Sequence, residues 1–485
     1  MLFSSVPFLY YFLPAVVLTY FLLSWGVEGA FRLWGKESLG KRAGLFTKNV
    51  ILLAFSLLFY AWGEPKYVFL MIGAIVLFWG CGLAIGKAKT RVWKRVWLCG
   101  SIVVGVAQLG VFKYADFFVE NFNALTGLST PLLRLALPVG ISFYTFQAMS
   151  YAVDVYRGDT AVQKNPISFG TYVALFPQLI AGPIVRYVDV AREIDNRSHS
   201  WGEIAQGLRR FIIGLSKKII LADNFALLMS LFRESKEQSV LFYWIYAVAF
   251  ALNIYFDFSG YSDMAIGLGR VFGFHFIENF NYPYMSKSVA EFWRRWHMSL
   301  GSWFRDYVYI PLGGNRVGKG RWIFNTLVVW MLTGFWHGAS WNFVLWGLVY
   351  AVALMIEKWV PFLKKMPDIL RRIYTLLVVM FGFVVFNAVD LSQIGTDLAG
   401  LFGLGGLPVY NGETLYYLGS FAVLLAVGLV GSTSWVKNTV NRLASGKKTA
   451  TVVAILEPLV LLLLLLVCTG YLVDGAFSPF LYFRF

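Results

Sequence analysis

Charge and cysteine are both scarce in this 485-residue sequence, and each shortage narrows the class of protein. Only 14% of the residues are charged and 58% are hydrophobic, whereas about a quarter of the residues in a soluble domain carry charge. A soluble globular protein is therefore excluded. The three cysteines, Cys81, Cys99 and Cys468, form no C-x-x-C pair, and we interpret them as small apolar residues rather than a disulfide framework.

Motifs of soluble enzymes and of metal sites are also missing. No G-x-S-x-G sequence is present, and the glycine-rich stretch "GGNRVGKG" ends at Gly320, where a phosphate-binding loop requires Ser or Thr. The four histidines, at 199, 275, 297 and 337, have no metalloprotease spacing. We predict neither a nucleotide-binding loop nor a bound metal.

Long apolar runs are abundant and predict membrane-spanning helices. The runs lie at about 2–24, 49–62, 67–86, 96–113, 132–153, 166–185, 205–232, 239–258, 322–336, 338–356, 371–389, 415–433 and 449–473. Because several are short or interrupted, the sequence predicts an all-α polytopic membrane protein with about 11–13 transmembrane or re-entrant helices. The first run has no preceding basic residue and no cleavage site, so we expect a retained helix.

Basic residues are concentrated in alternate loops, which predicts the orientation in the membrane. The basic loops are expected to be cytoplasmic, and both termini extracytoplasmic. Since these residues are dispersed among apolar runs, the net charge of +16 indicates topology rather than nucleic-acid binding. They are Arg32, Lys36, Lys41, Arg42 and Lys48, then Lys87, Lys89, Arg91, Lys94 and Arg95, then Lys358, Lys364, Lys365, Arg371 and Arg372, and finally Lys437, Arg442, Lys447 and Lys448.

The stretch "EFWRRWHMSLGSWFRDYVYIPLGGNR" (291–316) combines arginines, a histidine and large aromatic residues. Its aromatic and apolar residues recur every three or four positions, which predicts one amphipathic helix over 291–310 lying at the cytoplasmic interface. Glu291 precedes Arg294 and Arg295 by three and four residues, so ion pairs along this helix are expected. A packed, hydrogen-bonded role and a reactive role for His297 remain open.

Other polar residues occur inside or beside apolar runs, where ionisable groups are costly and often functional. Asp257, Ser259 and Asp263 end one run, and "NFNYP" adds Asn279 and Asn281. His337 lies at the junction of two apolar segments. The alternatives are a hydrogen bond between helices for His337 and ion pairs of the two aspartates with Arg270 or Arg294.

These polar motifs resemble, in order, those of the membrane-bound O-acyltransferase family, in its bacterial branch of polysaccharide O-acetylases. The resemblance covers most of the chain. The motifs are "LPVGISFYTFQAMSYAVDVYRG" (137–158), "FPQLIAGPIVRY" (176–187), "DFSGYSDMAIGLGRVFGF" (257–274), "NFNYPYMSKSVAEFWRRWHMSLGSWFRDYVYIPLGGNR" (279–316) and "LTGFWHGASWNFVLWG" (332–347).

The resemblance implies a helical fold around a central tunnel, with His337 catalytic and His297 a second active-site residue. We expect one integral membrane domain over 1–485, with amino-terminal helices over 1–113, a catalytic core over 114–390 and carboxy-terminal helices over 391–485. The remaining residues expected to line the donor site or tunnel are Trp336, Trp341, Asn342, Asp257, Ser259, Asp263, Arg294, Arg295, Trp296 and Arg305.

The implied activity is transfer of an acetyl group from cytosolic acetyl-CoA to an extracytoplasmic polysaccharide such as alginate, cellulose or peptidoglycan. Neutral imidazole at His337 would act as the base. The implied location is the bacterial inner membrane. The implied partners are the lipid bilayer and an extracytoplasmic acetyltransferase resembling SGNH hydrolases, with no permanently bound cofactor. A D-alanyl or lipid acyltransferase of the same family and a transporter or flippase are the alternatives.

Overall fold

The computed structural model describes residues 2–475, which contain helices and no β-strand. Compact packing divides the chain into two units that interleave along the sequence. Unit 1 contains the chain up to Phe211 together with Ser262–Ile277, and unit 2 contains Ile212–Tyr261 together with the chain from Glu278 onward. The single domain expected over 1–485 stays a prediction, and residues 476–485 lie outside the described range.

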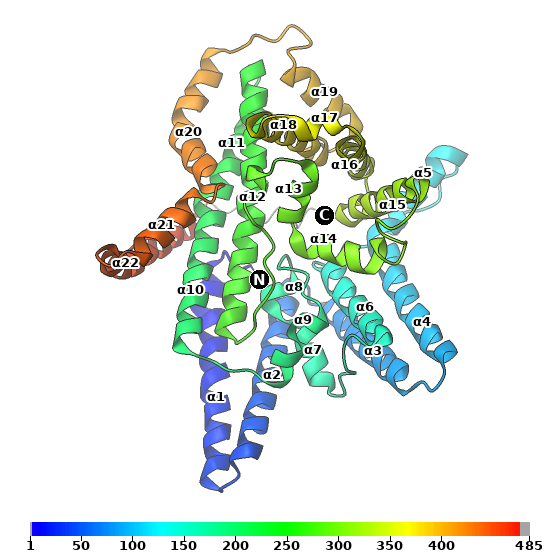
Figure 1. Cartoon of the computed structure of the whole chain (residues 1–485), viewed down its shortest axis with the longest axis vertical. Helices are drawn as coiled ribbons and strands as arrows, with labels where there is room; N and C mark the ends of the chain where they lie inside the picture. The colour runs from blue at the N-terminus through cyan, green and yellow to red at the C-terminus, as the bar shows by residue number, and fades with distance from the viewer. Residues whose placement is uncertain (1, 476–485) are drawn as a thin grey trace. The chain divides into compact units, whose positions relative to one another are not determined.

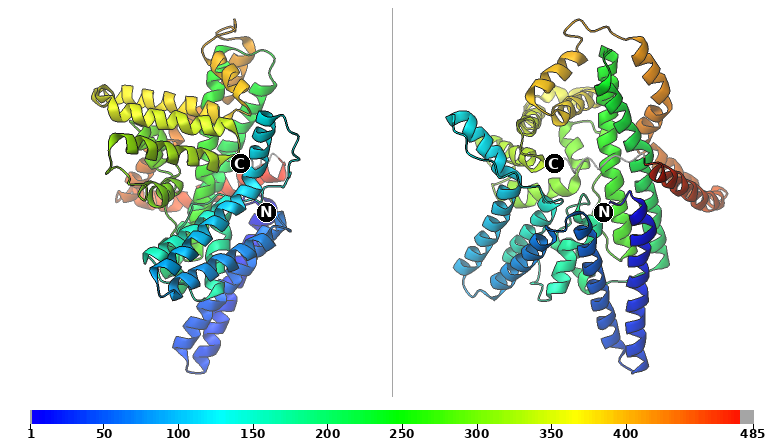
Figure 2. Two further views of the ribbon diagram at one scale, coloured as in Figure 1. Left: turned by 90° about the vertical axis from the view of Figure 1, so that its right-hand side faces the viewer. Right: turned by 180° about the vertical axis from the view of Figure 1, so that it is seen from behind.

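Unit 1 is built mainly from the amino-terminal helices. The long helices α1 and α2 run side by side as an antiparallel hairpin (Figures 1 and 2). The helices of this unit are α1 (Leu13–Leu33), α2 (Glu37–Gly63), α3 (Val68–Lys87), α4 (Arg91–Leu109), α5 (Ala115–Thr126), α6 (Ile141–Arg157), α7 (Pro166–Ala174), α8 (Phe176–Leu179) and α9 (Tyr187–Asp195).

Two helices run across the boundary between the units, and the remaining helices after α9 belong to unit 2. The boundary helices are α10 (Trp201–Ser216) and α12 (Val240–Val271). Unit 2 also contains α11 (Asp223–Glu234), α13 (Val289–Arg295), α14 (Met298–Phe304), α15 (Lys319–His337), α16 (Trp341–Trp359), α17 (Pro361–Lys365), α18 (Asp368–Asn387), α19 (Leu391–Leu401), α20 (Gly412–Gly431), α21 (Trp435–Ser445) and α22 (Thr449–Val473).

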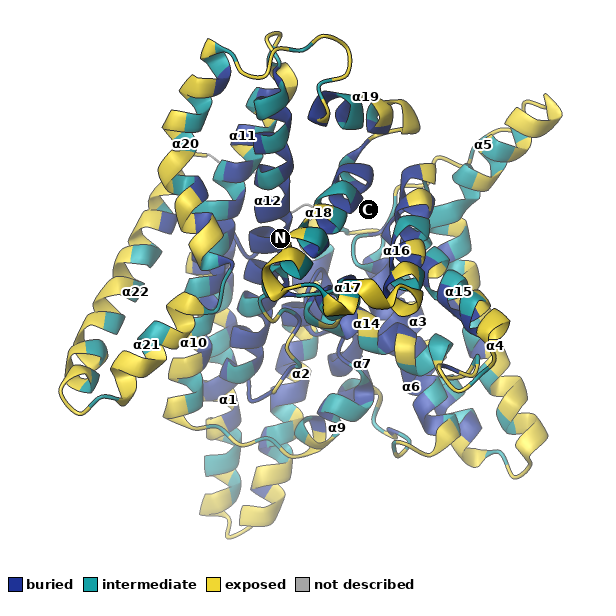
Figure 3. Ribbon diagram, turned by 45° about the horizontal axis from the view of Figure 1, so that its top comes forward, coloured by how far each residue is buried: buried dark blue, intermediate teal, exposed yellow. Residues whose placement is uncertain are grey.

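Within residues 2–475, nine helices are long and apolar enough to cross a membrane. The protein is therefore an all-α, multi-pass membrane protein, as the apolar runs predict. The four other predicted runs, at 132–153, 166–185, 205–232 and 322–336, form helices that are shorter, interrupted or more polar. Most of α12 is buried, whereas Cys468 is the one buried residue of α22 (Figure 3). An apolar helix with so little burial in the protein suits lipid.

The prediction of one interfacial helix over 291–310 is wrong. The segment forms α13, breaks at Trp296 and His297, and continues as α14 and a short π-helix at Arg305–Tyr309. Phe292 and Trp296 are buried and their rings stack at 5.4 Å inside the apolar core of unit 2. The apolar stripe therefore faces protein rather than lipid, because helical periodicity cannot distinguish these two apolar surroundings.

Candidate active site

His337 is the last residue of α15 and lies in an aromatic pocket of unit 2. Its ring centroid is 4.9 Å from that of Trp336, 5.0 Å from that of Trp346 and 5.1 Å from that of Phe386, each in an edge-to-face arrangement. Only 5% of the residue is exposed. An imidazole in such surroundings experiences little competition from water, so its hydrogen bonds and charge interactions are strengthened.

His297 occupies the break between α13 and α14 and has the left-handed backbone angles φ 43 and ψ 53. This conformation is uncommon for a residue with a side chain and costs on the order of 1–3 kcal/mol. The ring is buried, with its centroid 5.6 Å from that of Trp336. Burial lowers the pKa of His297 to about 3, so its imidazole is neutral near pH 7.

The two histidines line one cavity of about 450 Å³, which we call the histidine cavity. Its wall comes from α13, α14, α15 and α16, and includes Trp293, Trp296 and Trp330. The predicted residues Arg294 and Arg305 also line it. Residues 40 positions apart in sequence thus contribute two imidazoles to one cavity lined largely by aromatic and apolar side chains.

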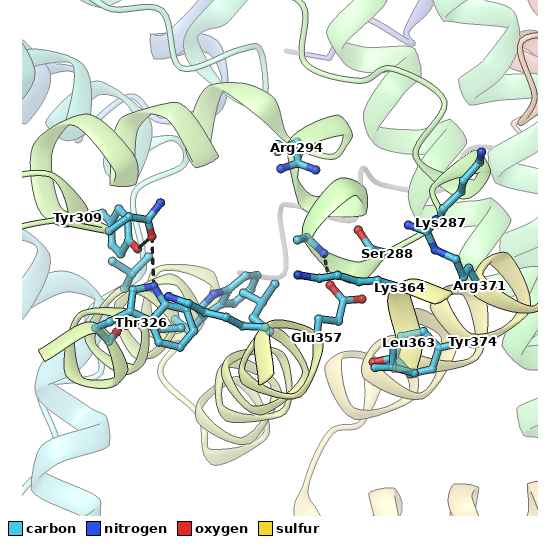
Figure 4. Close-up of a pocket in the computed structure, with 17 residues that line it drawn as sticks. Lys287, Ser288, Arg294, Tyr309, Thr326, Glu357, Leu363, Lys364, Arg371 and Tyr374 are labelled. Atoms are coloured by element: carbon cyan, nitrogen blue, oxygen red, sulfur yellow. Dashed lines mark hydrogen bonds between the residues drawn. The ribbon is translucent and has the colours of Figure 1, made fainter. Parts of the chain in front are cut away.

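A second cavity of unit 2, of about 670 Å³, adjoins the first and is strongly basic. In this basic cavity Glu357 is the one acidic lining residue, and its carboxylate accepts hydrogen bonds from the backbone N–H groups of Val289 (2.5 Å) and Ala290 (3.0 Å). Figure 4 shows Lys364 beside Glu357, with Lys287, Arg294 and Arg371 among the other residues that line the cavity. The basic lining residues are Lys287, Arg294, Lys358, Lys364 and Arg371.

The two cavities share part of their walls, so a ligand held by the cations can extend towards the histidines. Arg294 is the charged member of this shared wall. The residues that line both cavities are Ala290, Arg294, Tyr309, Val329, Trp330 and Leu354.

Several residues expected at the site make other contacts. Arg295 pairs with Glu291 at 2.6 Å, one helical turn away. Asn342 donates to the carbonyls of Phe386 (3.3 Å) and Ala388 (2.9 Å), which ties α16 to the end of α18. Trp341 is half exposed. None of these three side chains lines either cavity among the described residues.

The polar residues of α12 form ion pairs that differ from the expected ones. Asp257 pairs with Lys218 at 2.8 Å, inside unit 2, and both are almost fully buried. Asp263 pairs with Arg210 at 2.8 Å, inside unit 1. Pairing with Arg270 or Arg294 is therefore wrong. Ser259 is buried on the same helix and lines neither cavity.

The remaining two histidines lie in unit 1. His275 faces two carboxylates, with Nδ1 2.7 Å from Glu193 and Nε2 3.0 Å from Glu203. The hydrogen bond with Glu193 raises the pKa of His275 above its usual value, and the bond with Glu203 acts in the same direction. Burial instead lowers the pKa of His199 to about 4.

Sequence reasoning gave no site role to Asn279 or to the lysines of the basic cavity. Asn279 was visible as a polar residue in an apolar context, but its partner could not be derived from spacing. Lys358 and Lys364 were visible as topology signals. Only the fold brings them beside Arg294.

An all-helical, multi-pass fold with two histidines in one aromatic cavity defines a membrane protein with a buried chemical site. Residues 161–391 match the family model described as "MBOAT, membrane-bound O-acyltransferase family". The chain is 36% identical over 507 residues to "Probable alginate O-acetylase AlgI" of Pseudomonas putida, with both chains covered completely. The chain therefore belongs to the membrane-bound O-acyltransferase family.

Two further relatives have related names. "Probable alginate O-acetylase AlgI" of Pseudomonas syringae pv. tomato is 40% identical over 413 residues, which cover 84% of this chain and 76% of the relative. "Peptidoglycan O-acetyltransferase" of Helicobacter pylori is 35% identical over 442 residues, which cover 84% of this chain and 81% of the relative. The names of both relatives describe acetyl transfer to an oxygen atom of a polymer.

Proposed function

We propose that this family member is an O-acetyltransferase that uses acetyl-CoA from the cytosol to acetylate an extracytoplasmic polysaccharide. The observation that carries the proposal is the shared wall between the histidine cavity and the basic cavity. A polyanionic donor fits the cations of the basic cavity. Its reactive end then has a short route to His337 and His297.

In the proposed mechanism, His337 is the general base. Its imidazole takes the proton of the attacking hydroxyl while the hydroxyl oxygen forms a bond to the thioester carbonyl carbon. The carbon–sulfur bond then breaks, and the proton passes from His337 to the departing thiolate. These steps account for every bond and proton in the transfer and involve no change of oxidation state. The aromatic side chains around the histidines keep water from competing as a nucleophile.

His297 is proposed as the second catalytic residue. Arg294 is proposed to contact the donor, because it is the cation common to both cavities. Trp296 and Arg305 are proposed to shape the histidine cavity that they line. Trp336 contacts both imidazoles through its ring and is proposed to hold their relative orientation.

The proposed location is the bacterial inner membrane, with both termini extracytoplasmic. The alternating basic loops support this orientation, and it makes Lys358, Lys364 and Arg371 cytoplasmic, on the side where acetyl-CoA occurs. A single cysteine near Lys89 or Lys447 should be labelled only after the cytoplasmic face is opened, and one near Gly405 should be labelled from outside. The reverse pattern would contradict the orientation.

The route of the acetyl group after the transfer step is proposed to include an extracytoplasmic acetyltransferase partner. The names of the relatives support a polymer acceptor, with alginate-like polysaccharide and peptidoglycan as the first candidates. Cellulose is the third candidate that the family resemblance offers.

Transfer of labelled acetyl-CoA in membranes tests the proposal against its alternatives. We expect covalent acetylation of an acceptor that depends on coenzyme A thioester and on His337. Transfer only after addition of a carrier-protein thioester would instead indicate a D-alanyl or lipid acyltransferase. Movement of a substrate across vesicles without any covalent change would indicate a transporter or flippase.

A further inference from the structure

The backbone around His297 is held in place by the segment Asn279–Asn281. The N–H of Asn281 donates to the carbonyl of Arg295 at 2.9 Å, and the N–H of Met298 donates to the carbonyl of Asn279 at 3.0 Å. These two hydrogen bonds lie on either side of His297. They explain how a residue with a side chain is kept at φ 43.

The side-chain amide of Asn279 has only one possible orientation. Its Oδ1 lies 3.2 Å from the backbone nitrogen of Ser299, and a backbone N–H can only donate. The atom facing Ser299 must therefore be the amide oxygen and not the amide nitrogen. The Ser299 hydroxyl donates to the same oxygen at 2.9 Å.

This oxygen determines which nitrogen of His297 carries the proton. Nδ1 of His297 lies 3.1 Å from Oδ1 of Asn279. Because the oxygen accepts, Nδ1 must donate, and in a neutral imidazole the lone pair is then on Nε2. The Ser299 oxygen, 3.4 Å from Nδ1, accommodates the same arrangement because its own proton points to Asn279.

Burial makes this arrangement costly to lose. Asn279 is 1% exposed and His297 is 2% exposed. Water does not readily replace a missing acceptor in such surroundings, and leaving a buried donor unsatisfied is unfavourable. The low pKa of His297 also keeps its ring neutral, so the two tautomers, rather than the charged form, are the states to distinguish.

We propose that Asn279 is a positioning residue that holds the proton on Nδ1 of His297, so that Nε2 accepts a hydrogen bond from a substrate in the histidine cavity. That substrate group is a hydroxyl of the acetyl acceptor other than the attacking one, whose single proton goes to His337. This part of the inference rests on the proposed O-acetyltransferase function. The tautomer itself depends only on the contacts among Asn279, His297 and Ser299.

The tautomer is measurable without any enzymatic assay. The chain has only four histidines, so purified protein labelled with ¹⁵N at histidine gives few resonances. Loss of a pair of resonances in His297→Gln identifies those of His297. At pH 8 we expect a protonated Nδ1 and an unprotonated Nε2 in the wild type and in Asn279→Asp, because a carboxylate still accepts from all three donors. A protonated Nε2 in the wild type would overturn the proposal.

Kinetics of three variants test the positioning role. Asn279→Ala should lower kcat for acetyl transfer about ten- to a hundredfold per amount of inserted protein, the range found for partners that orient metal-bound histidines. The KM for acetyl-CoA should change little. Asn281→Ala is the matched control, because that exposed side chain lies two residues further along the same segment and only its backbone contacts Arg295.

The pH dependence of Asn279→Asp distinguishes a positioning role of Asn279 from a purely structural one. A carboxylate beside Nδ1 stabilises the imidazolium, so the variant should keep substantial activity near pH 8 and lose it as pH falls, with a new acid limb that the wild type lacks. Identical pH profiles for wild type and Asn279→Asp, or an unchanged kcat in Asn279→Ala, would overturn the positioning role. If the wild type transfers no acetyl group, the proposed function fails, and the nitrogen resonances still decide the tautomer.

Discussion

The histidine cavity and the basic cavity share a wall but have opposite chemistry. The first is lined largely by aromatic and apolar side chains around His297 and His337, and the second has five basic side chains and one carboxylate. Charge recognition works in the presence of water, whereas proton transfer gains from its exclusion. The contrast indicates that donor binding and chemistry are carried by different residues, so their substitution should change different kinetic constants.

The largest effect is expected at His337. Positioned general bases contribute about a hundred- to ten-thousandfold in rate, so His337→Ala should lose nearly all acetyl transfer. His337→Gln is the matched variant, because it keeps side-chain volume among Trp336, Trp346 and Phe386 without supplying a base of similar strength. The measurement is acetylated product per amount of inserted protein. His297→Ala should lose activity by a smaller factor.

The next largest effect is expected at Arg294 of the basic cavity, and it should appear in the KM for acetyl-CoA. Arg294→Gln should raise the KM for acetyl-CoA roughly fivefold, since one partly exposed cation–phosphate contact is worth about 1 kcal/mol. Its kcat should be nearly unchanged. Arg295→Gln is the control, because Arg295 pairs with Glu291 and lines neither cavity among the described residues. Equal donor kinetics in the two variants would contradict the assignment of Arg294.

A moderate effect on stability is expected at Glu357, on the floor of the basic cavity. Its two carboxylate oxygens each accept a backbone N–H from the start of α13, and a glutamine offers only one such oxygen. Glu357→Gln should therefore lower the free energy of unfolding by about 1 kcal/mol, as loss of a helix cap does. The midpoint of thermal unfolding in detergent measures this loss. An unchanged midpoint would show that the cap is dispensable.

The smallest effect is expected at His275 in unit 1, a histidine whose surroundings contrast with those of His297. Since Glu193 and Glu203 raise its folded-state pKa, the stabilisation is fully present below the unfolded value of about 6.5 and is lost as pH rises through the folded value. Glu203→Gln should lower the unfolding midpoint at pH 6 and leave it almost unchanged at pH 9. A decrease of equal size at both pH values would contradict an ion pair between protonated His275 and the two glutamates.

Much of the fold follows from the length of apolar runs. Each of the nine candidate spans found in residues 2–475 overlaps one of the thirteen predicted runs, because a run of about 20 apolar residues is stable in lipid only as a helix. The break at His297 had no such signal. The segment Arg294–Met298 contains neither glycine nor proline. The break is held by two backbone hydrogen bonds, one donated by Asn281 to Arg295 and one accepted by Asn279 from Met298, and both asparagines lie outside the helical segment.

The sequence predicts those site residues that lie in recognisable motifs. It does not predict those whose position depends on contacts between distant segments. Two sequence motifs indicate His297 and His337, and both residues line one cavity in the structure. Asp257 was also chosen, as a polar residue in an apolar run. Its buried partner Lys218 lies 39 residues earlier in sequence, and no local spacing relates the two.

Donor binding to His337→Ala tests the separation of binding from chemistry most directly. The measurement is a titration of purified variant and wild type with labelled acetyl-CoA, followed by quantification of acetyl transfer in the same samples. We expect the variant to bind acetyl-CoA with the Kd of the wild type and to transfer almost no acetyl group. Substantial transfer by a well-folded His337→Ala protein, or loss of donor binding together with transfer, would contradict the account.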